Sequence, residues 1–412
     1  MADFPIVLSE VVDNTTDVMA KYVNNIEAKL GIGVGTAANA AGGSILTKTD
    51  VTGETLWLEP LDSFKRQALL NSNFDVFQRG IITGESWTNP ASDSSHMDLY
   101  RLSYGYDGGT PPTNIVYSRE KLTPGDIPGS FFHLRIAPDG AGTKFGASMY
   151  SNYYQKVEHA NRYLAGNGKK VTISFYARSS IANKKLGFYL TQNYGTGGTP
   201  TAQEVIVGHT WTLTSSWVRY SFTLTTNTHA GKTFGTDNND HMALVFVLAW
   251  GTGTFATRVD SAGVGETFVG AGNIDIAQIQ LCAGDIALPY SPKMPLRELA
   301  DCQAYFIRIS SADNAFASFG TGINSTTTTN KPILSLPVTM RADPVFSCSA
   351  VDDFVVNHGG TTTQTTNVTA DRTTRNVATI VATVASGLTA GDAGTLLANN
   401  KTTAFMDFSA DL

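Results

Sequence analysis

The sequence predicts a mainly β protein, and three observations lead to that fold class. Short runs rich in Val, Ile, Thr, Tyr and Phe recur from residue 70 onward, separated by clusters of Gly, Pro, Asn and Asp, as in strands joined by turns. Within several runs apolar and polar residues alternate, which indicates strands with one buried face. Only 16% of the 412 residues are charged, so hydroxyl and amide groups supply much of the polar surface, as suits exposed sheet faces.

Residues 1–62 differ in character from the rest of the chain and predict a short helical segment, a linker and an extended piece. A stripe of side chains recurs there at heptad spacing, namely Val12, Thr16, Met19, Val23, Ile26 and Leu30. Met19, Val23, Ile26 and Leu30 would form the oligomerisation seam of a coiled coil, while the same stripe also fits an amphipathic helix packed on its own domain. The Gly- and Ala-rich stretch 31–44 is typical of a flexible linker.

Residues 63–296 predict a central jelly-roll β-sandwich, the two-sheet solution for an all-β segment of this length. The run VTISFYARS at 171–179 alternates strictly, so one of its faces is expected in the core. The run VFVLAW at 245–250 is apolar throughout and predicts a central strand between two sheets. Glycine- and proline-rich stretches at 108–112 and 195–200 predict turns.

Residues 297–412 predict a smaller C-terminal β-sandwich. Prolines in PYSPKMP at 289–295 mark the boundary, and LRELADCQAYF then predicts a short helix that passes into a strand. Further strand-like runs follow, and the Thr-rich stretches NSTTTTN (324–330) and GGTTTQTTN (359–367) between them are predicted turns. These charge-poor, Thr-lined loops suit either an adhesion surface or plain solvated turns.

The charge and cysteine content exclude several classes of protein. The net charge is −6, and no basic stripe occurs, so neither nucleic acid nor an anionic membrane is an expected partner. No secretory signal and no apolar run long enough for a bilayer is recognisable, so synthesis in a cytosol is expected. Three widely spaced cysteines, Cys282, Cys302 and Cys348, are best interpreted as buried free thiols.

No catalytic set is recognisable, so a non-enzymatic protein without a catalytic cofactor is predicted. The seven histidines are scattered, and neither an i, i+4 pair nor a Gly-x-Ser-x-Gly elbow occurs. Asp237, Asp240 and His241 cluster in TDNNDH, which fits a sugar or metal loop, but an acidic turn between two strands explains it more simply.

Five runs of sequence, called the landmark runs below, characterise the β-rich part of the chain. They are LLNSNFDVFQRG (69–80), VTISFYARSS (171–180), LTQNYGTGGTP (190–200), TLTSSWVRYSFTL (212–224) and IDIAQIQLCAG (274–284). In that order they resemble the β-sandwich proteins of bacteriophage tail fibres and related prophage structural proteins. The resemblance implies a component of the virion, made in the cytosol of a bacterial host, and commonly a homotrimer.

A jelly roll of this kind also resembles carbohydrate-binding modules, in which an opening Asn-Gly-x-Phe-acid strand and a closing Ile-Asp strand hold a structural calcium. The matching positions here are Asn73, Asp75 and Asp275. Carboxylate and carbonyl oxygens suit calcium, although Asp75 equally fits a side chain that caps a turn.

Carbohydrate binding needs aromatic rings that are exposed for stacking. Tyr104, Tyr106 and Tyr194 lie beside glycine-rich turns and are the candidate contacts. Trp87, seven residues after the first landmark run, and Trp217, within the fourth, are expected to pack on the sheets.

Two main hypotheses follow from the resemblance. In the first, the protein is a fibre that binds host receptors: residues 1–62 contact other virion proteins, and the distal residues 297–412 contact host surface glycan. In the second, it is a decoration or adaptor protein of the head, collar or baseplate that contacts only virion proteins. A polysaccharide-degrading spike or carbohydrate-active module is a weaker alternative, because no long β-helical repeat and no catalytic set occur.

Overall fold

The computed structural model describes residues 45–48, 55–58, 64–80, 86–108, 112–140, 146–268 and 270–412. The chain divides into two compact units, Met1–Arg66 and Gln67–Leu412. In the first unit, β1 (Ile45–Lys48) and β2 (Thr55–Leu58) form an antiparallel pair. The heptad stripe of Met19, Val23, Ile26 and Leu30 lies outside the described residues.

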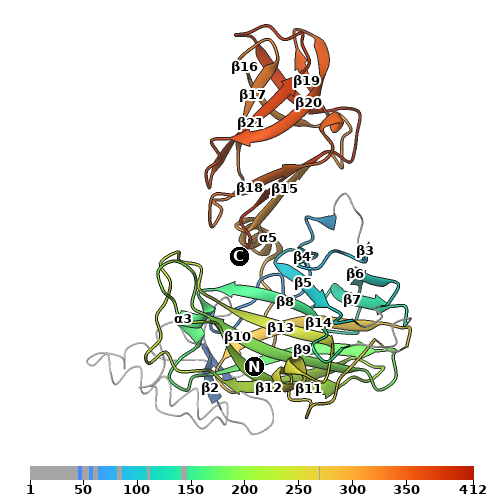
Figure 1. Cartoon of the computed structure of the whole chain (residues 1–412), viewed down its shortest axis with the longest axis vertical. Helices are drawn as coiled ribbons and strands as arrows, with labels where there is room; N and C mark the ends of the chain where they lie inside the picture. The colour runs from blue at the N-terminus through green and yellow to red at the C-terminus, as the bar shows by residue number, and fades with distance from the viewer. Residues whose placement is uncertain are drawn as a thin grey trace, which may run out of the picture. The chain divides into compact units, whose positions relative to one another are not determined.

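The larger unit begins with a jelly-roll β-sandwich of two six-stranded antiparallel sheets (Figure 1). The first sheet has the order β11-β10-β13-β8-β5-β4. Its strands are β4 (Ser94–Ser95), β5 (Tyr100–Gly105), β8 (Tyr150–Glu158), β10 (Lys185–Asn193), β11 (Glu204–Thr212) and β13 (His241–Trp250).

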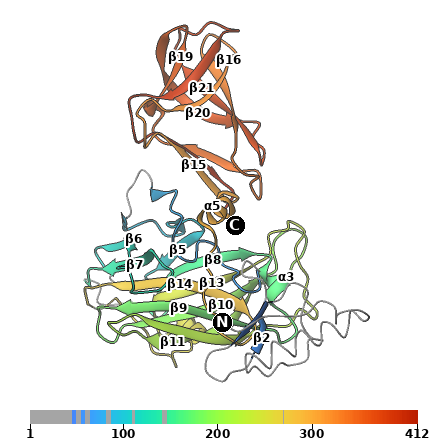
Figure 2. The ribbon, with the colours of Figure 1, turned by 180° about the vertical axis from the view of Figure 1, so that it is seen from behind.

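The second sheet has the order β12-β9-β14-β7-β6-β3, and Figure 2 shows both sheets from behind. Its strands are β3 (Ser86–Thr88), β6 (Ile115–Lys121), β7 (Phe132–Pro138), β9 (Lys170–Ser179), β12 (Val218–Thr225) and β14 (Ile274–Ala283). Two short helices, α3 (Ala160–Leu164) and α4 (Thr254–Arg258), lie in the connections. The mainly β class and the central jelly roll are therefore confirmed.

Two strand predictions show how the sequence builds this sandwich. On β9, Val171, Ile173, Phe175 and Ala177 are all at most 1% exposed and belong to the core between the sheets. All ten residues of β13 are buried, because β13 lies mid-sheet with the core on one face. On its other face, Val245 and Val247 pack in a cluster with residues of the α4 segment.

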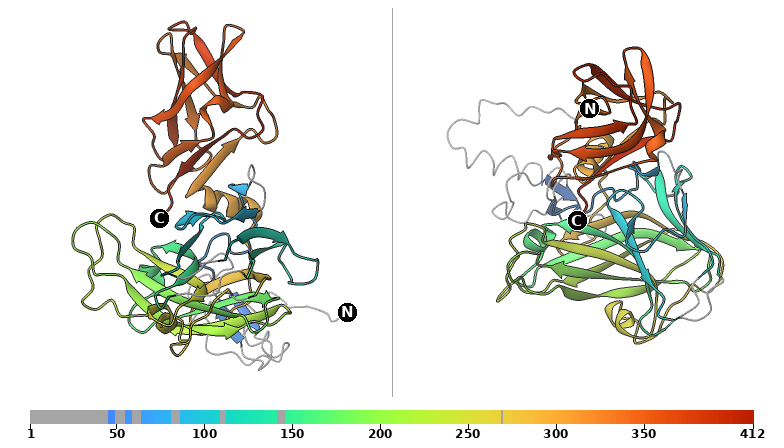
Figure 3. Two further views of the ribbon diagram at one scale, coloured as in Figure 1. Left: turned by 45° about the vertical axis from the view of Figure 1, so that its right-hand side comes forward. Right: turned by 45° about the horizontal axis from the view of Figure 1, so that its top comes forward.

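The C-terminal residues form a second core. Helix α5 (Pro295–Gln303) leads directly into β15 (Phe306–Ser310), as the sequence predicted. β15 joins β23 (Phe405–Ser409) and β18 (Val345–Cys348) in a three-stranded sheet of order β15-β23-β18. Figure 3 shows these strands and the barrel strands in orange and red.

The remaining C-terminal strands close into a six-stranded barrel, where the sequence predicted a sandwich. Its order is β16-β17-β21-β20-β19-β22, with β16 (Ser318–Asn324), β17 (Thr329–Ser335), β19 (Phe354–His358), β20 (Thr361–Asp371), β21 (Val377–Val384) and β22 (Ala393–Ala398); a short 3-10 turn, η3 (Val351–Asp353), precedes β19. Small interior residues permit this closure. Ala378 and Ala382 of β21 are fully buried, and Gly394 of β22 lies so close to Asn330 that a Cβ there would stand 2.6 Å from Nδ2.

One Thr-rich stretch is also corrected. Residues 325–328 do form the turn between β16 and β17, but only Gly359 and Gly360 of the second stretch turn the chain, with φ of 54° and 81°. Thr361 onward continues as strand β20, because β-branched threonine favours extended backbone once the glycines have made the reversal.

The three cysteines are free thiols; Cys282 and Cys302 are buried as predicted, and Cys348 is half-buried. Within the described ranges, no helix is both long and apolar enough to cross a membrane.

Candidate ligand pocket

The predicted calcium ligand Asp275 is engaged by two arginines instead. It lies on β14 between β7 and β9, whose registers place Arg135 and Arg178 directly opposite. Arg135 Nε donates to Oδ1 at 2.8 Å and its Nη2 to Oδ2 at 2.9 Å, while Arg178 Nε donates to Oδ2 at 2.9 Å. Burial alone would raise the pKa of Asp275, but the hydrogen bonds from Arg135 and Arg178, together with His133 Nε2 at 3.6 Å from Oδ2, outweigh it and hold that pKa well below its usual range.

Asn73 and Asp75 belong to a different set of contacts. Asn73 Nδ2 donates to Asp75 Oδ2 at 3.1 Å and to the Gly129 oxygen at 3.2 Å, and Ser130 Oγ donates to Asn73 Oδ1. Burial raises the pKa of Asp75, although Asn73 and Arg119 partly offset it. No group of three or more His, Cys, Asp or Glu side chains that could hold a metal occurs in the part of the chain that the structure describes. Asp275 thus has hydrogen-bond partners separate from those of Asn73 and Asp75, and a bound calcium stays a prediction.

Tyr194 is not exposed, so the expectation for this residue is wrong. Its side chain is fully buried, its ring meets the edges of His229 and Phe234, and its Oη donates to Glu204 Oε2 at 2.7 Å. A loop some forty residues later in the chain packs over it, and Gly235 N donates to the Tyr194 main-chain oxygen at 2.7 Å. Tyr194 therefore cannot stack on a ligand from solvent.

Tyr104 and Tyr106, by contrast, line one pocket of about 150 Å³. Both side chains are half-buried, and their ring centroids lie 5.1 Å apart with the planes tilted by 38°. The pocket is lined by Asn89, Pro90, Tyr104, Tyr106, Pro112, Ile115 and Tyr117. The structure thus brings together two of the three predicted aromatic contacts.

Both sheets contribute to this pocket. Tyr104 follows Tyr100 and Leu102 by strand alternation, so it lies on the core-facing side of β5 in the first sheet. Ile115 and Tyr117 come from β6 of the second sheet, and both are buried. The pocket therefore opens between the two sheets, at β5 and β6, which each lie next to the edge strand of their sheet.

A turn after β3 forms the rim. Asn89 has a left-handed backbone with φ of 49°, which asparagine tolerates better than most residues. Its Oδ1 accepts the Ile115 N–H at 2.8 Å, and its Nδ2 donates to the Thr113 oxygen at 3.0 Å. This bracing fixes the next residue, Pro90, whose oxygen accepts the Tyr104 hydroxyl at 3.3 Å. The ring of Tyr104 is consequently held in place before any ligand arrives.

The lining carries no charged side chain among the described residues. Burial, with a smaller effect from Tyr104, raises the pKa of Tyr106 to about 12, so its hydroxyl remains protonated at neutral pH. Two carboxylates lie beside the lining. Asp107 accepts the Ser148 N–H at 2.8 Å, and Asp139 accepts the Asn114 N–H at 2.7 Å. The pocket can therefore stack an apolar face and exchange neutral hydrogen bonds, while the nearby acids disfavour anions.

Sequence reasoning identified Tyr104 and Tyr106 but missed the other five lining residues. The Asn89-Pro90 pair and Pro112, in a Pro-Pro pair, are recognisable turn signals, yet nothing local indicates that these turns face β5. Ile115 and Tyr117 look like ordinary core residues of a strand. Only the pairing of strands from different sheets brings the set together.

The remaining candidates have packing roles. Trp87 meets the edge of His96 at 5.1 Å, and Trp217 meets His133 at 5.3 Å, as expected of tryptophans packed on the sheets. The side chains of TDNNDH turn to separate partners: Asp240 to Arg162 at 2.7 Å, and Asp237 to Thr196 at 2.8 Å. This arrangement is that of an acidic turn.

Comparison with known proteins finds no matching family model and no matching curated protein. Among solved structures, similar ones include a CBM4 module with 16% identity, which covers 52% of this chain and 98% of its own, with a TM-score of 0.28. The N-terminal cellulose-binding domain of a Cellulomonas fimi β-1,4-glucanase has 14% identity, coverages of 41% and 88%, and a TM-score of 0.25. The CBM22-2 xylan-binding domain from Paenibacillus barcinonensis has 14% identity, coverages of 48% and 99%, and a TM-score of 0.27.

Proposed function

We propose that this chain is a non-enzymatic glycan-binding protein, and that the pocket of Tyr104 and Tyr106 takes one neutral sugar ring. The observation that carries the proposal is the pair of half-buried tyrosine rings in a pocket without charged side chains. A sugar ring has an apolar face that stacks on tyrosine and hydroxyl groups that pair with phenol and main-chain oxygens.

The size of the pocket favours a single ring over an extended chain. Its volume of about 150 Å³ lies below the roughly 300–1,000 Å³ of pockets that enclose a drug-sized ligand. A terminal sugar unit is therefore the expected ligand. Asp107 and Asp139 beside the lining favour neutral sugars over uronic or sialic acids, because a second negative charge nearby is repelled.

The test is a glycan array followed by titration calorimetry with the best neutral hit. Tyr106→Ala is expected to weaken binding about five- to tenfold, since loss of one stacked ring removes about 1–1.5 kcal/mol. Tyr163→Ala is the matched control, because Tyr163 on α3 is 62% exposed and does not line the pocket. Equal loss of binding in both variants, or no glycan binding by the full chain, contradicts the proposal.

We also propose that the protein is a bacteriophage virion fibre, as the ordered landmark runs imply. Residues 1–62 would attach it to other virion proteins, and the chain would act as a homotrimer. We propose that glycan contact lies in the central sandwich, because the pocket of Tyr104 and Tyr106 lies there, whereas the resemblance alone suggested residues 297–412.

Two experiments separate the fibre from a head, collar or baseplate adaptor. Purified full-length protein should adsorb to host cells and compete with phage, and a chain lacking residues 1–62 should keep that binding but no longer enter particles. Particle incorporation without any host adsorption would favour the adaptor. Normal incorporation of the truncated chain would refute the role of residues 1–62, and a monomer in light scattering would refute the trimer.

A further inference from the structure

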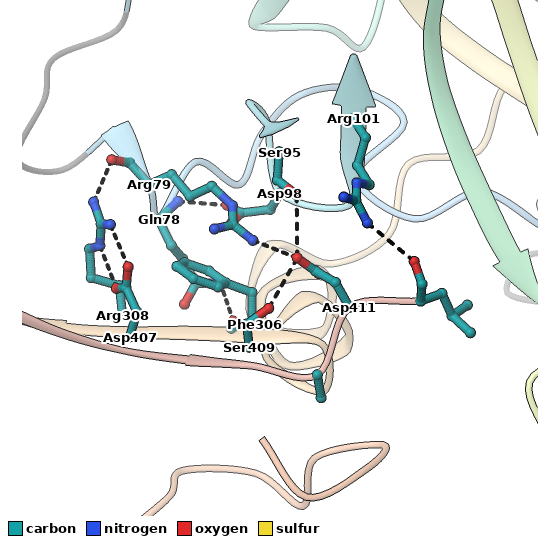
Figure 4. Close-up of polar contacts among 12 residues, drawn as sticks. Gln78, Arg79, Ser95, Asp98, Arg101, Phe306, Arg308, Asp407, Ser409 and Asp411 are labelled. Carbon is teal, nitrogen blue, oxygen red and sulfur yellow. Dashed lines mark hydrogen bonds and ion pairs between the residues drawn. The ribbon is translucent and has the colours of Figure 1, made fainter. Parts of the chain in front are cut away.

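The sandwich and the C-terminal domain meet at a polar network within residues 67–412 (Figure 4). Arg79, from the first loop of the sandwich, donates from Nη2 to Asp411 Oδ2 at 2.9 Å. The same carboxylate oxygen accepts Ser95 Oγ at 3.3 Å and Ser409 Oγ at 3.1 Å. Asp411 thus connects two sandwich segments to the end of the strand that centres the C-terminal sheet.

A second arginine ties the network from the other side. Arg308 on β15 pairs with Asp407 through Nε and Nη2, both at 2.7 Å, and its Nη1 donates to the Arg79 oxygen at 2.7 Å. The Arg79 guanidinium lies 3.5 Å from the centroid of the Phe306 ring. Gln78 Nε2 donates to the Phe306 oxygen at 2.8 Å. Three contacts of β15 therefore join the loop of residues 78–79 to the C-terminal sheet.

Asp98 lies beneath this network and is incompletely paired. It is fully buried, its Oδ2 accepts the Gln78 N–H at 2.6 Å, and its Oδ1 accepts no hydrogen bond from the described residues. The charged and titratable groups facing it come from every neighbouring element: Arg79 of the same loop network, Arg308 of β15, Asp411 after β23, Cys302 of α5 and Tyr153 of β8. An ionised Asp98 therefore lies near the carboxylate of Asp411, and its Oδ1 accepts no hydrogen bond from the described residues.

We propose that this network is a pH-sensitive latch between the two domains, closed in mildly acidic solution and loosened as the solution becomes neutral. The buried, half-paired carboxyl of Asp98 is the switch. When Asp98 is neutral, Arg79 pairs with Asp411 alone, and this ion pair and the contacts of Gln78 and Arg308 hold the domains together. When Asp98 is ionised, a buried charge lacks full hydrogen bonding, and it competes with Asp411 for the Arg79 guanidinium.

Docking of the two domains weakens as pH rises, because Asp98 is buried. Burial, only partly offset by Arg79 and the Gln78 N–H, raises the pKa of Asp98 to about 6. Because the pKa of Asp98 is raised in the docked state, the contribution of Asp98 to docking is complete below the ordinary pKa of a carboxyl group. This contribution is lost as pH rises through about 6. The shift of about two pKa units corresponds to a roughly hundredfold larger ratio of undocked to docked molecules at high pH, when undocking exposes Asp98 to water.

A second buried acid acts in the same direction. Glu298 on α5, the helix that connects the domains, accepts the Asn71 N–H through Oε1, and burial raises the pKa of Glu298. Asn71 Nδ2 in turn donates to the Asp98 main-chain oxygen at 3.1 Å. Glu298 therefore supports the latch in acid, and its contribution must be separated from that of Asp98 in any test.

The test measures the distance between the two domains in the full-length protein. Fluorophores are attached at the exposed positions Thr225→Cys on β12 and Thr362→Cys on β20, in a Cys348→Ser background that removes the half-buried thiol. Single-molecule energy transfer is then recorded from pH 5 to pH 8. The expected result is one narrow distance at pH 5 and a second, variable population that grows through about pH 6.

Two isosteric variants and a control decide the outcome. Asp98→Asn should keep the narrow distance in neutral solution, Glu298→Gln should retain most of the pH response, and Asp126→Asn, at an exposed loop acid, should behave as the parent. Asp411→Asn should move the midpoint to lower pH, because the acid that opposes ionisation of Asp98 is gone. A parent distance that is invariant from pH 5 to pH 8, or an Asp98→Asn protein that titrates like the parent, overturns the proposal. Circular dichroism confirms folding of each variant.

Discussion

Replacing Asp275 tests whether arginines, and not a metal, balance the buried charge of the sandwich. The side chain is 3% exposed, whereas those of Arg135 and Arg178 are 26% and 31% exposed. Asp275→Ala leaves two guanidinium groups side by side with no carboxylate between them. Removing one partner of a buried ion pair costs about 3–5 kcal/mol. Because both arginines keep some access to water, we expect the lower end, about 3 kcal/mol of the free energy of unfolding.

Urea unfolding followed by tryptophan fluorescence is the assay. All five tryptophans precede residue 251 and none occurs in residues 297–412, so the signal does not report on the barrel. With a urea slope of about 2 kcal/mol per molar, a loss of about 3 kcal/mol lowers the midpoint by about 1.5 M. Asp285→Ala is the matched control, since Asp285 pairs with Lys170 at 3.0 Å on the surface, and the midpoint should not move.

The chelator and the pH dependence complete the test. Excess EDTA should leave the parent midpoint unchanged. The pKa of Asp275 is depressed in the folded state, so its stabilising contribution is present above its ordinary value and is lost as pH falls below about 4. A chelator-sensitive midpoint, or an Asp275→Ala protein as stable as the parent, would refute the assignment of the two arginines as its counter-ions.

Three further predictions concern the cores. His96 is fully buried, and burial lowers its pKa to about 4; the sandwich should therefore lose stability as pH falls from about 6.5 to about 4, and His96→Gln should flatten that part of a pH series of urea midpoints. Phe175→Ala removes a fully buried ring that meets Trp211 and Phe246 at 5.0 Å; it should cost about 3–5 kcal/mol, and a change under about 1 kcal/mol would contradict this core packing. Gly394→Ala places a Cβ 2.6 Å from Asn330 Nδ2 inside the barrel; calorimetry should show the barrel destabilised by about 1–3 kcal/mol with the tryptophan transition unmoved.

The amino-acid sequence by itself determined the class of the fold and many of its strands. The alternation from Val171 to Ala177 predicts β9, because side chains of a strand point alternately to the two faces. The apolar run 245–250 predicts a strand buried on both faces, and the proline-bounded start of α5 predicts the helix that opens the C-terminal domain. Each of these signals is local, because propensity, period and turn chemistry act over a few residues.

The tertiary structure alone decided which distant residues became partners. Asp275 carries the motif of a calcium ligand, but the strands beside it supply Arg135 and Arg178, and no local pattern specifies a strand's neighbours. Tyr194 follows a strand and precedes glycines just as an exposed residue would, yet a loop some forty residues later in the chain packs over it. Tyr104 and Tyr117 line one pocket because β5 and β6 belong to facing sheets. Sequence-distant contacts form from the packing energy of the whole sandwich, and a short motif does not encode them.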